Sequence, residues 1–219
     1  MIFIKTEKME LRNNKVSGDS IMRYFICLSG LDGSGKTTQC KLLCKNLMHK
    51  KPIYYTFGDE EDSNRVNRAT INYIKKTNLR LNNDQKYLIK SAFHMYFDIQ
   101  RLTNKEEFSD QIVVMDRYVE TIYVHAQLHG IGPEIINEIF EGIYVKPDFY
   151  FFLDLRPEIC YQRIKRRSEA INKHEELANL IKLNKFYEEI VKRLDITVIN
   201  GNKTLLEVSK DIAQYINLK

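Results

Sequence analysis

The sequence has little of what marks several large protein classes. Cysteine is scarce: the four residues Cys27, Cys40, Cys44 and Cys160 form no C-x-x-C pair and no metal-ligand spacing with histidines. We therefore expect reduced thiols in a cytoplasmic protein, not a disulfide framework, a zinc site or a redox pair. No run of about 18 apolar residues occurs, so we expect no membrane-spanning helix.

Dense positive charge is also absent. The formal net charge is +5, and no block of five or more Lys and Arg residues occurs. The densest basic segment, residues 163–167, is short. This pattern argues against a nucleic-acid-binding protein, whereas a mild positive charge is compatible with acidic ligands such as nucleotides.

The beginning of the chain shows no clear hydrophobic period. Residues 1–5 are too few and too soon interrupted by charge to form a secretory signal, and residues 10–20 are polar. We predict a disordered leader over residues 1–21, or a start codon assigned too early. Residues 22–219 then have the length of a single domain.

Short apolar runs alternate with segments of helical periodicity along this domain. The predicted strands cover residues 24–28, 53–57, 112–115, 149–153 and 196–199. The predicted helices cover residues 36–50, 63–76, 83–103, 118–129, 134–144, 157–167, 175–194 and the segment from 204 onward. Because the strands are solidly apolar and alternate with helices, we predict a doubly wound α/β domain with a five-stranded parallel sheet and helices on both faces.

Residues 30–37 match the phosphate-binding pattern G-x-x-x-x-G-K-[ST] in full. The match follows the first predicted strand and opens a helix, which is the context that the pattern requires. The alternative is a glycine-rich turn that contains a lysine by chance, and such a turn would have no reason to lie between a strand and a helix. Glycines let backbone N–H groups turn inward around phosphates, Lys36 reaches the β- and γ-phosphates, and the Thr37 hydroxyl ligates magnesium. The sequence therefore predicts an ATP site with Mg²⁺ as the cofactor.

Asp116 follows the third predicted strand directly. Open α/β sheets bind ligands at the carboxyl ends of their strands, and P-loop enzymes hold magnesium with such an aspartate. Alone, a strand-terminal aspartate is as often a helix cap. Beside a complete phosphate loop, we predict that Asp116 is a metal ligand.

Two classes of P-loop protein compete at this point, namely GTPase switches and small-molecule kinases. GTPases recognise guanine with an Asn-Lys-x-Asp segment. Asn-Lys begins at Asn104, Asn172, Asn184 and Asn202, and the fourth position is never aspartate. This favours a kinase.

Together these motifs resemble the thymidylate kinase family. The resemblance rests on residues 30–39, 116–118, 147–154 and 157–158, and their order and spacing agree over nearly the whole chain from Met22 onward. It implies the five-stranded nucleoside-monophosphate kinase fold. It also implies phosphoryl transfer from MgATP to dTMP, giving dTDP, by a homodimer packed through helices.

The resemblance also implies roles for single residues. Asp32 would contact the 3′-hydroxyl of the acceptor sugar, and Arg117 would bind the acceptor phosphate. A mobile lid would cover residues 164–176, with Glu175 closing it. The predicted ATP-binding residues are Gly30, Leu31, Asp32, Gly33, Ser34, Gly35, Lys36, Thr37, Thr38, Arg163 and, beside the adenine, Asn200. The predicted catalytic residues are Lys36, Asp116, Arg117 and Arg167, and the predicted metal ligands are Thr37 and Asp116.

Some family members carry an arginine inside the phosphate loop, at the position of Gly33. Transfer between two phosphates brings negative charges together, so cations must neutralise them. We therefore expect the missing cation to come from the lid, as Arg166, Arg167 or Lys173.

The acceptor side departs from the family pattern. The family has Phe-Pro-x-Arg after the second strand, where this chain has Phe57 and then an acidic segment, residues 58–62. A helical arginine that stacks on thymine is replaced by His94, and Ala-Tyr-Gln is replaced by residues 124–126, Val-His-Ala.

Three interpretations of these departures stay open. In the first, the acceptor is different, either another deoxynucleotide or a nucleoside. In the second, Arg65, Arg68 and Arg101 bind the acceptor in place of the family's arginines. In the third, the chain is a non-catalytic nucleotide-binding relative. The predicted acceptor-binding residues are Asp32, Phe57, Arg65, Arg68, His94, Arg101, Arg117 and Tyr118.

Overall fold

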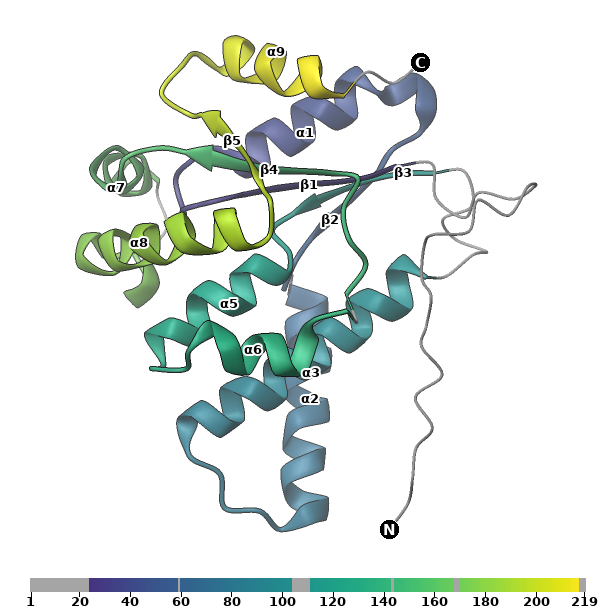
Figure 1. The fold of residues 1–219 in the computed structure, drawn as a ribbon, viewed down its shortest axis with the longest axis vertical. Helices are drawn as coiled ribbons and strands as arrows, with labels where there is room; N and C mark the ends of the chain where they lie inside the picture. Colours follow the sequence, from purple (N-terminus) through teal and green to yellow (C-terminus); the bar gives the residue numbers. More distant parts are fainter. Residues whose placement is uncertain (1–23, 59, 104–110, 143, 168–169, 217–219) are drawn as a thin grey trace.

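The computed structural model describes residues 24–58, 60–103, 111–142, 144–167 and 170–216. The predicted leader, residues 1–21, lies outside this range. The strands are β1 (Tyr24–Gly30), β2 (Ile53–Thr56), β3 (Ile112–Asp116), β4 (Phe149–Asp154) and β5 (Thr197–Asn200). They form one parallel sheet in the order β2-β3-β1-β4-β5 (Figure 1). The predicted fold class is confirmed.

The helices of the described residues fill the connections between these strands. They are α1 (Lys36–Asn46), α2 (Glu60–Thr77), α3 (Asn83–Leu102), α5 (Val119–Leu128), α6 (Pro133–Phe140), α7 (Pro157–Lys165), α8 (Leu177–Arg193) and α9 (Leu205–Tyr215). Two 3₁₀ turns, η1 (Met48–Lys50) and η2 (Lys173–Glu175), lie after α1 and before α8.

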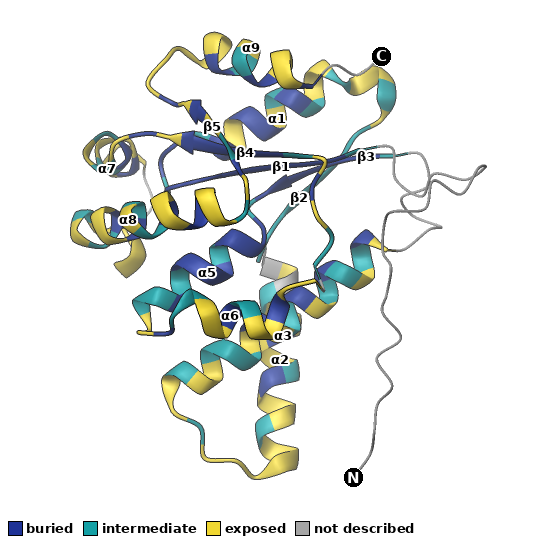
Figure 2. Cartoon of the chain, in the orientation of Figure 1, coloured by how far each residue is buried: buried dark blue, intermediate teal, exposed yellow. Residues whose placement is uncertain are grey.

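The strands alternate their side chains between two apolar layers. In β1, Phe25 and Cys27 belong to one buried cluster, whereas Ile26 and Leu28 belong to the other. This is the period of two that an extended strand imposes. Helices α1 and α9 cover one face of the sheet, and α5 and α8 cover the other (Figure 1). The central strands β1, β3 and β4 are therefore buried between helices, whereas the edge strands β2 and β5 are only partly buried (Figure 2).

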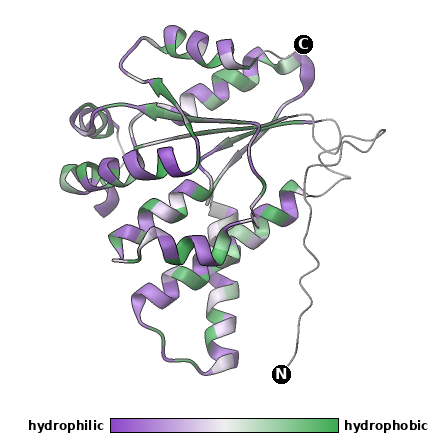
Figure 3. Cartoon of the chain, viewed as in Figure 1, coloured by the Kyte–Doolittle hydropathy of each residue, from purple (hydrophilic) through white to green (hydrophobic). Residues whose placement is uncertain are grey.

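The helices α2 and α3 pack on each other and extend away from the sheet beyond α5 (Figure 1). Apolar and polar residues alternate along both helices (Figure 3). None of the helices in the described part of the chain combines the length and apolar composition that a membrane crossing needs.

Three helix boundaries differ from the prediction by three residues or more, one of them the end of α6, which lies at Phe140 where we expected residue 144. The first helix ends at Asn46, and the 3₁₀ turn η1 follows it, where we expected one helix to residue 50. Lys51 adopts a left-handed conformation with φ 48° and precedes Pro52, which disfavours helix at the residue before it. In addition, α2 begins at Glu60, three residues before the expected start at residue 63.

The topology brings the sequence motifs to one crevice. β1 lies between β3 and β4 in the sheet: the chain places β2 and β3 on one side of β1 and then crosses to place β4 and β5 on the other. Such a switch point opens a crevice at the carboxyl ends of the strands. Gly30 ends β1 and Asp116 ends β3, which places the phosphate loop and the predicted metal ligand side by side.

Candidate active site

The phosphate loop connects β1 to α1 and requires glycine at specific positions. Gly33 has φ 84°, and a Cβ there would lie 2.4 Å from the carbonyl oxygen of Cys160 at the start of α7. At Gly30 the φ is 147°, and a Cβ would lie 2.7 Å from Ser34 Oγ. The loop is therefore tightly packed against α7, and Gly33 leaves no room for the arginine that some family members place there.

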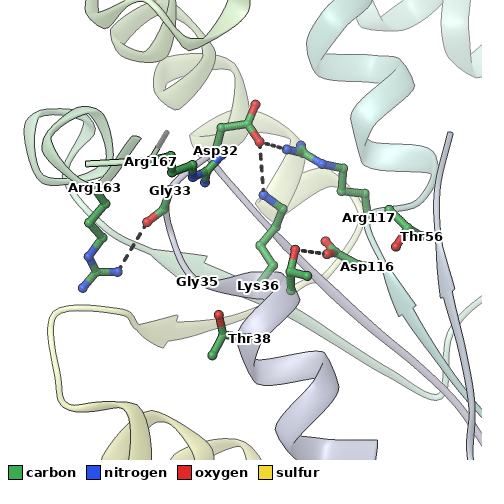
Figure 4. Close-up of a pocket in the computed structure, with 11 residues that line it drawn as sticks. Asp32, Gly33, Gly35, Lys36, Thr38, Thr56, Asp116, Arg117, Arg163 and Arg167 are labelled. Atoms are coloured by element: carbon green, nitrogen blue, oxygen red, sulfur yellow. Dashed lines mark hydrogen bonds and ion pairs between the residues drawn. The ribbon is translucent and has the colours of Figure 1, made fainter. Parts of the chain in front are cut away.

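Lys36 is the buried cation of the loop, with 5% of its surface exposed. Its Nζ donates a hydrogen bond to the carbonyl of Leu31 at 3.0 Å and lies 3.6 Å from Asp32 Oδ1. Burial and the charge of Arg117 lower the pKa of Lys36, and the carboxylates of Asp32 and Asp116 oppose this shift. The ammonium group therefore lies at the loop centre, where Figure 4 shows it pointing towards Asp32.

Thr37 and Asp116 form the candidate metal site. The Thr37 hydroxyl donates a short hydrogen bond to Asp116 Oδ2, and Tyr54 Oη lies 3.5 Å from the same oxygen. The other carboxylate oxygen, Oδ1, is buried with no hydrogen-bond partner among the described residues. Magnesium prefers oxygen ligands and is bound through one or two protein oxygens. This hydroxyl and this carboxylate fit that requirement.

Arg117 is held against Asp32 by an ion pair across the crevice (Figure 4). Arg117 adopts a left-handed backbone conformation with φ 68°, uncommon for a non-glycine residue, and its N–H donates to the carbonyl of Leu28 at 2.9 Å. Burial opposes ionisation of Asp32, but Arg117 and Lys36 outweigh it and hold the pKa of this carboxyl below its usual range. Both partners of the pair are therefore charged at neutral pH.

Two arginines reach the crevice from the predicted lid region. The guanidinium of Arg163, on α7, donates to the carbonyls of Ser34 at 3.2 Å and Gly33 at 3.4 Å. Arg167 follows α7, and its Nη1 lies 3.2 Å from Glu175 Oε1. Arg163 thus braces the phosphate loop, whereas Arg167 is held by the acidic residue that the resemblance placed in the lid.

These groups converge on one cavity of about 400 Å³. It is lined by Asp32, Gly33, Gly35, Lys36, Thr37, Thr38, Thr56, Asp116, Arg117, Arg163 and Arg167. All four residues predicted to be catalytic line it. Of the three lid cations that we considered, all of which are exposed, Arg167 lines the cavity and Arg166 and Lys173 do not.

Asn200, predicted to lie beside the adenine, is outside this lining. It ends β5, is exposed, and its Oδ1 accepts a hydrogen bond from the N–H of Asn202 at 2.9 Å. Its part in binding adenine stays a prediction.

The predicted acceptor residues are only partly brought together. Asp32 and Arg117 line the cavity. Beyond it, the rings of Phe57 and His94 lie 5.3 Å apart between their centroids, so the residue after β2 and the histidine of α3 form one aromatic contact. Their contact with an acceptor stays a prediction.

The three substitute arginines lie outside the lining. Arg65 stacks on Phe97 at 3.9 Å from the ring centroid, Arg101 lies 4.5 Å over the ring of Tyr55, and Arg68 is exposed on α2. The structure thus holds Arg65 and Arg101 against aromatic rings. Their contact with an acceptor phosphate stays a prediction.

The predicted contact of Tyr118 with the acceptor is wrong. Its side chain is fully buried in the core, edge-on to Phe25 with centroids 5.2 Å apart, and its hydroxyl accepts from the N–H of Val145 at 3.1 Å. The residue turns inward because Arg117, before it, takes the left-handed conformation. Tyr118 therefore supports the loop and does not line the cavity.

Thr56 lines the cavity and was not predicted. It ends β2 and is paired in register with Asp116 of β3. The same strand-end rule that selected Asp116 would have selected it.

A complete phosphate loop between β1 and α1, with a strand-terminal aspartate beside it, defines a P-loop phosphotransferase of the α/β class. The family model for thymidylate kinase matches residues 28–212. The chain therefore belongs to the thymidylate kinase family, and the predicted class of enzyme, a nucleoside-monophosphate kinase, is confirmed.

Curated relatives agree with this assignment over most of their length. A thymidylate kinase of Leptospira interrogans is 28% identical over 193 residues, which cover 85% of this chain and 90% of the relative. A probable thymidylate kinase of Methanocaldococcus jannaschii is 30% identical over 193 residues, covering 88% and 95%. A probable thymidylate kinase of Archaeoglobus fulgidus is 27% identical over 203 residues, covering 89% and 97%.

Proposed function

We propose that this chain transfers the γ-phosphoryl group of ATP to dTMP, giving dTDP. The observation that carries this proposal is the convergence of Lys36, Arg117 and Arg167 with the Thr37–Asp116 pair on one cavity. The names of the curated relatives support dTMP as the acceptor, because each relative is described as a thymidylate kinase or a probable thymidylate kinase.

The donor half of the site follows from the phosphate loop. Backbone N–H groups of the loop and the Lys36 ammonium bind the phosphates of ATP, and the N-terminus of α1 adds its positive dipole end. Thr37 and Asp116 would hold Mg²⁺, which, when bound with ATP, neutralises charge on the β- and γ-phosphates. Arg163 keeps the loop in shape through the Gly33 and Ser34 carbonyls.

The transfer itself requires cations between the two nucleotides. Arg117 is fixed by Asp32 at one side of the cavity, and Arg167 is fixed by Glu175 at the other. We assign Arg117 to the acceptor phosphate and Arg167 to the charge that develops on the transferred group. Such prearranged cations stabilise developing charge without having to be reoriented during the reaction.

A second acceptor class is supported by one contact. His94 stands where the family has a base-stacking arginine, and it packs on Phe57. A site lined by these two rings would accept a different base or a nucleoside, so the test must include other nucleoside monophosphates as well as nucleosides.

We further propose a cytoplasmic homodimer. The four cysteines are free thiols, as expected in a reducing compartment.

The proposed dimer rests on large apolar side chains that are exposed on α2, α3 and α6, namely Ile71, Tyr73, Tyr96, Ile135 and Ile139. Their burial between two copies would remove apolar surface from water. Sedimentation of wild type and an Ile139→Glu variant tests this, and a monomeric wild type would contradict it.

The decisive experiment incubates the protein with MgATP and a panel of nucleosides and nucleoside monophosphates, and measures ADP release. We expect dTMP to give the highest kcat/KM, and the Lys36→Ala variant to lose that activity. A nucleoside or another deoxynucleotide as the best acceptor would replace dTMP in the proposal. No acceptor-dependent ADP release from the wild type would point to a non-catalytic relative.

A further inference from the structure

The predicted lid and helix α5 meet at two histidines that lie outside the cavity lining. His125 is partly buried on α5, and His174 is exposed on the 3₁₀ turn η2. Their ring centroids are 5.2 Å apart, with an interplanar angle of 63°. This is the edge-to-face range in which aromatic rings attract each other.

On the lid side, this contact continues directly to Arg167. Glu175, next to His174, accepts from Arg167 Nη1 at 3.2 Å through one carboxylate oxygen and from the N–H of Asn172 at 3.1 Å through the other. Asn172 Oδ1 in turn accepts from the N–H groups of His174 at 2.9 Å and Glu175 at 3.1 Å. The turn η2 is therefore a closed hydrogen-bonded unit that carries His174 on one side and holds Arg167 on the other.

On the α5 side, the histidine contact lies close to Arg117 in the chain. Helix α5 begins at Val119, two residues after Arg117, so the helix that carries His125 follows Arg117 almost directly. Burial and then the Arg117 cation lower the pKa of His125 to about 4. His125 is therefore neutral at neutral pH and can pack on a second ring without charge repulsion.

We propose that the contact between His125 and His174 positions Arg167 relative to Arg117 for phosphoryl transfer. The two histidines are positioning residues, because neither lines the cavity and His174 acts through Glu175. The inference rests on the proposed kinase function and deepens it, since it names what fixes the lid cation. Without this contact the ring pair no longer joins η2 to α5, and the hydrogen bonds that close η2 should open more often.

The kinetic test compares His174→Ala with His174→Phe, using MgATP and the best acceptor. His174 is exposed, so neither change should unfold the domain. We expect His174→Ala to lower kcat by about tenfold with little change in the KM for ATP, because a transition-state contact is misplaced. His174→Phe should restore most of the activity, since it keeps a ring at the contact. The matched control is His129→Ala, at the C-terminal cap of α5, which removes a ring stacked on Tyr87 at 4.7 Å and should leave kcat unchanged.

A double-mutant cycle tests whether His174 acts through Arg167. In the Arg167→Ala background, adding His174→Ala should change kcat by less than about twofold, because coupled residues are non-additive. A full tenfold loss in both backgrounds would overturn the proposal. So would an unchanged kcat for His174→Ala, or a loss that Phe does not restore.

Hydrogen exchange separates this inference from the kinase function itself. The N–H groups of His174 and Glu175 are measured in the wild type and in His125→Ala. Faster exchange in the variant is expected, because the turn loses its attachment to α5. Unchanged exchange would overturn the positioning role whatever the enzyme's acceptor. Faster exchange together with a wild type that transfers no phosphoryl group would leave the contact in place and refute the function alone.

Discussion

Acidification should destabilise this protein in part through His125. The pKa of this imidazole falls from 6.5 in an unfolded chain to about 4 in the folded protein, because of burial and the Arg117 cation. Between these two pH values the unfolded chain binds more protons at this site than the folded chain does. The folded state therefore loses stability as the pH falls from 6.5 towards 4.

The magnitude follows from the size of the shift. At about 1.4 kcal/mol per pKa unit, the lowering of the His125 pKa to about 4 corresponds to at most roughly 3 kcal/mol of unfolding free energy. That is a large part of the roughly 5–15 kcal/mol that stabilises a typical domain. Other acidic groups titrate in the same range, so the effect must be isolated by comparison with a variant.

The assay is urea unfolding of the wild type and His125→Phe at a series of pH values from 7 to 4. Phenylalanine keeps the ring but cannot be protonated. The unfolding free energy of the wild type, minus that of the variant, should fall by up to about 3 kcal/mol across this range. His49→Phe, which removes an exposed imidazole on η1, is the control and should track the wild type. A difference that does not change with pH would refute the reasoning.

Four further changes probe the site. Lys36→Ala should lower kcat/KM by roughly a hundredfold or more in a coupled ADP-release assay, since it removes the buried cation of the loop; near-normal turnover would contradict its role. Arg167→Ala should lower kcat more than it raises the KM for ATP, and a change confined to KM would make Arg167 a ground-state binding residue. Gly33→Ala should destabilise the fold more than Gly130→Ala in urea unfolding, because both positions have positive φ but only Gly33 meets a backbone atom, at 2.4 Å; equal losses would show that the collision relaxes. The double variant Arg65→Ala/Arg68→Ala should raise the acceptor KM by about tenfold and leave ATP binding intact if these arginines reach the acceptor phosphate; unchanged acceptor kinetics would assign Arg65 to its contact with Phe97.

The sheet and the phosphate loop could be predicted because their signals are local. The strands are short apolar runs, and in β1 the four residues Phe25–Leu28 alternate between two buried clusters. The loop pattern lies within residues 30–37, and its meaning depends only on the strand before it and the helix after it. Asp116 was found by the same local rule, as the residue that ends a strand.

What the sequence could not provide is set by packing between distant segments. Tyr118 follows Arg117 in a motif and yet points into the core, because the left-handed φ of 68° at Arg117 turns the chain. The pairing of Arg167 with Glu175 was not predicted, and it depends on the closed turn at Glu175. The contact of His125 with His174 joins segments about fifty residues apart, and no periodicity indicates such a pair.

The close approach of Gly33 to Cys160 has a mechanical consequence. The carbonyl of Cys160 in the first half of α7 meets the loop backbone, and Arg163 on the next turn is bonded to the carbonyls of Gly33 and Ser34. These contacts join the phosphate-binding loop to α7 at two points. If residues 164–176 open and close as the resemblance predicts, the contacts place the hinge beyond Arg163, so that product leaves without a change in the phosphate-binding loop.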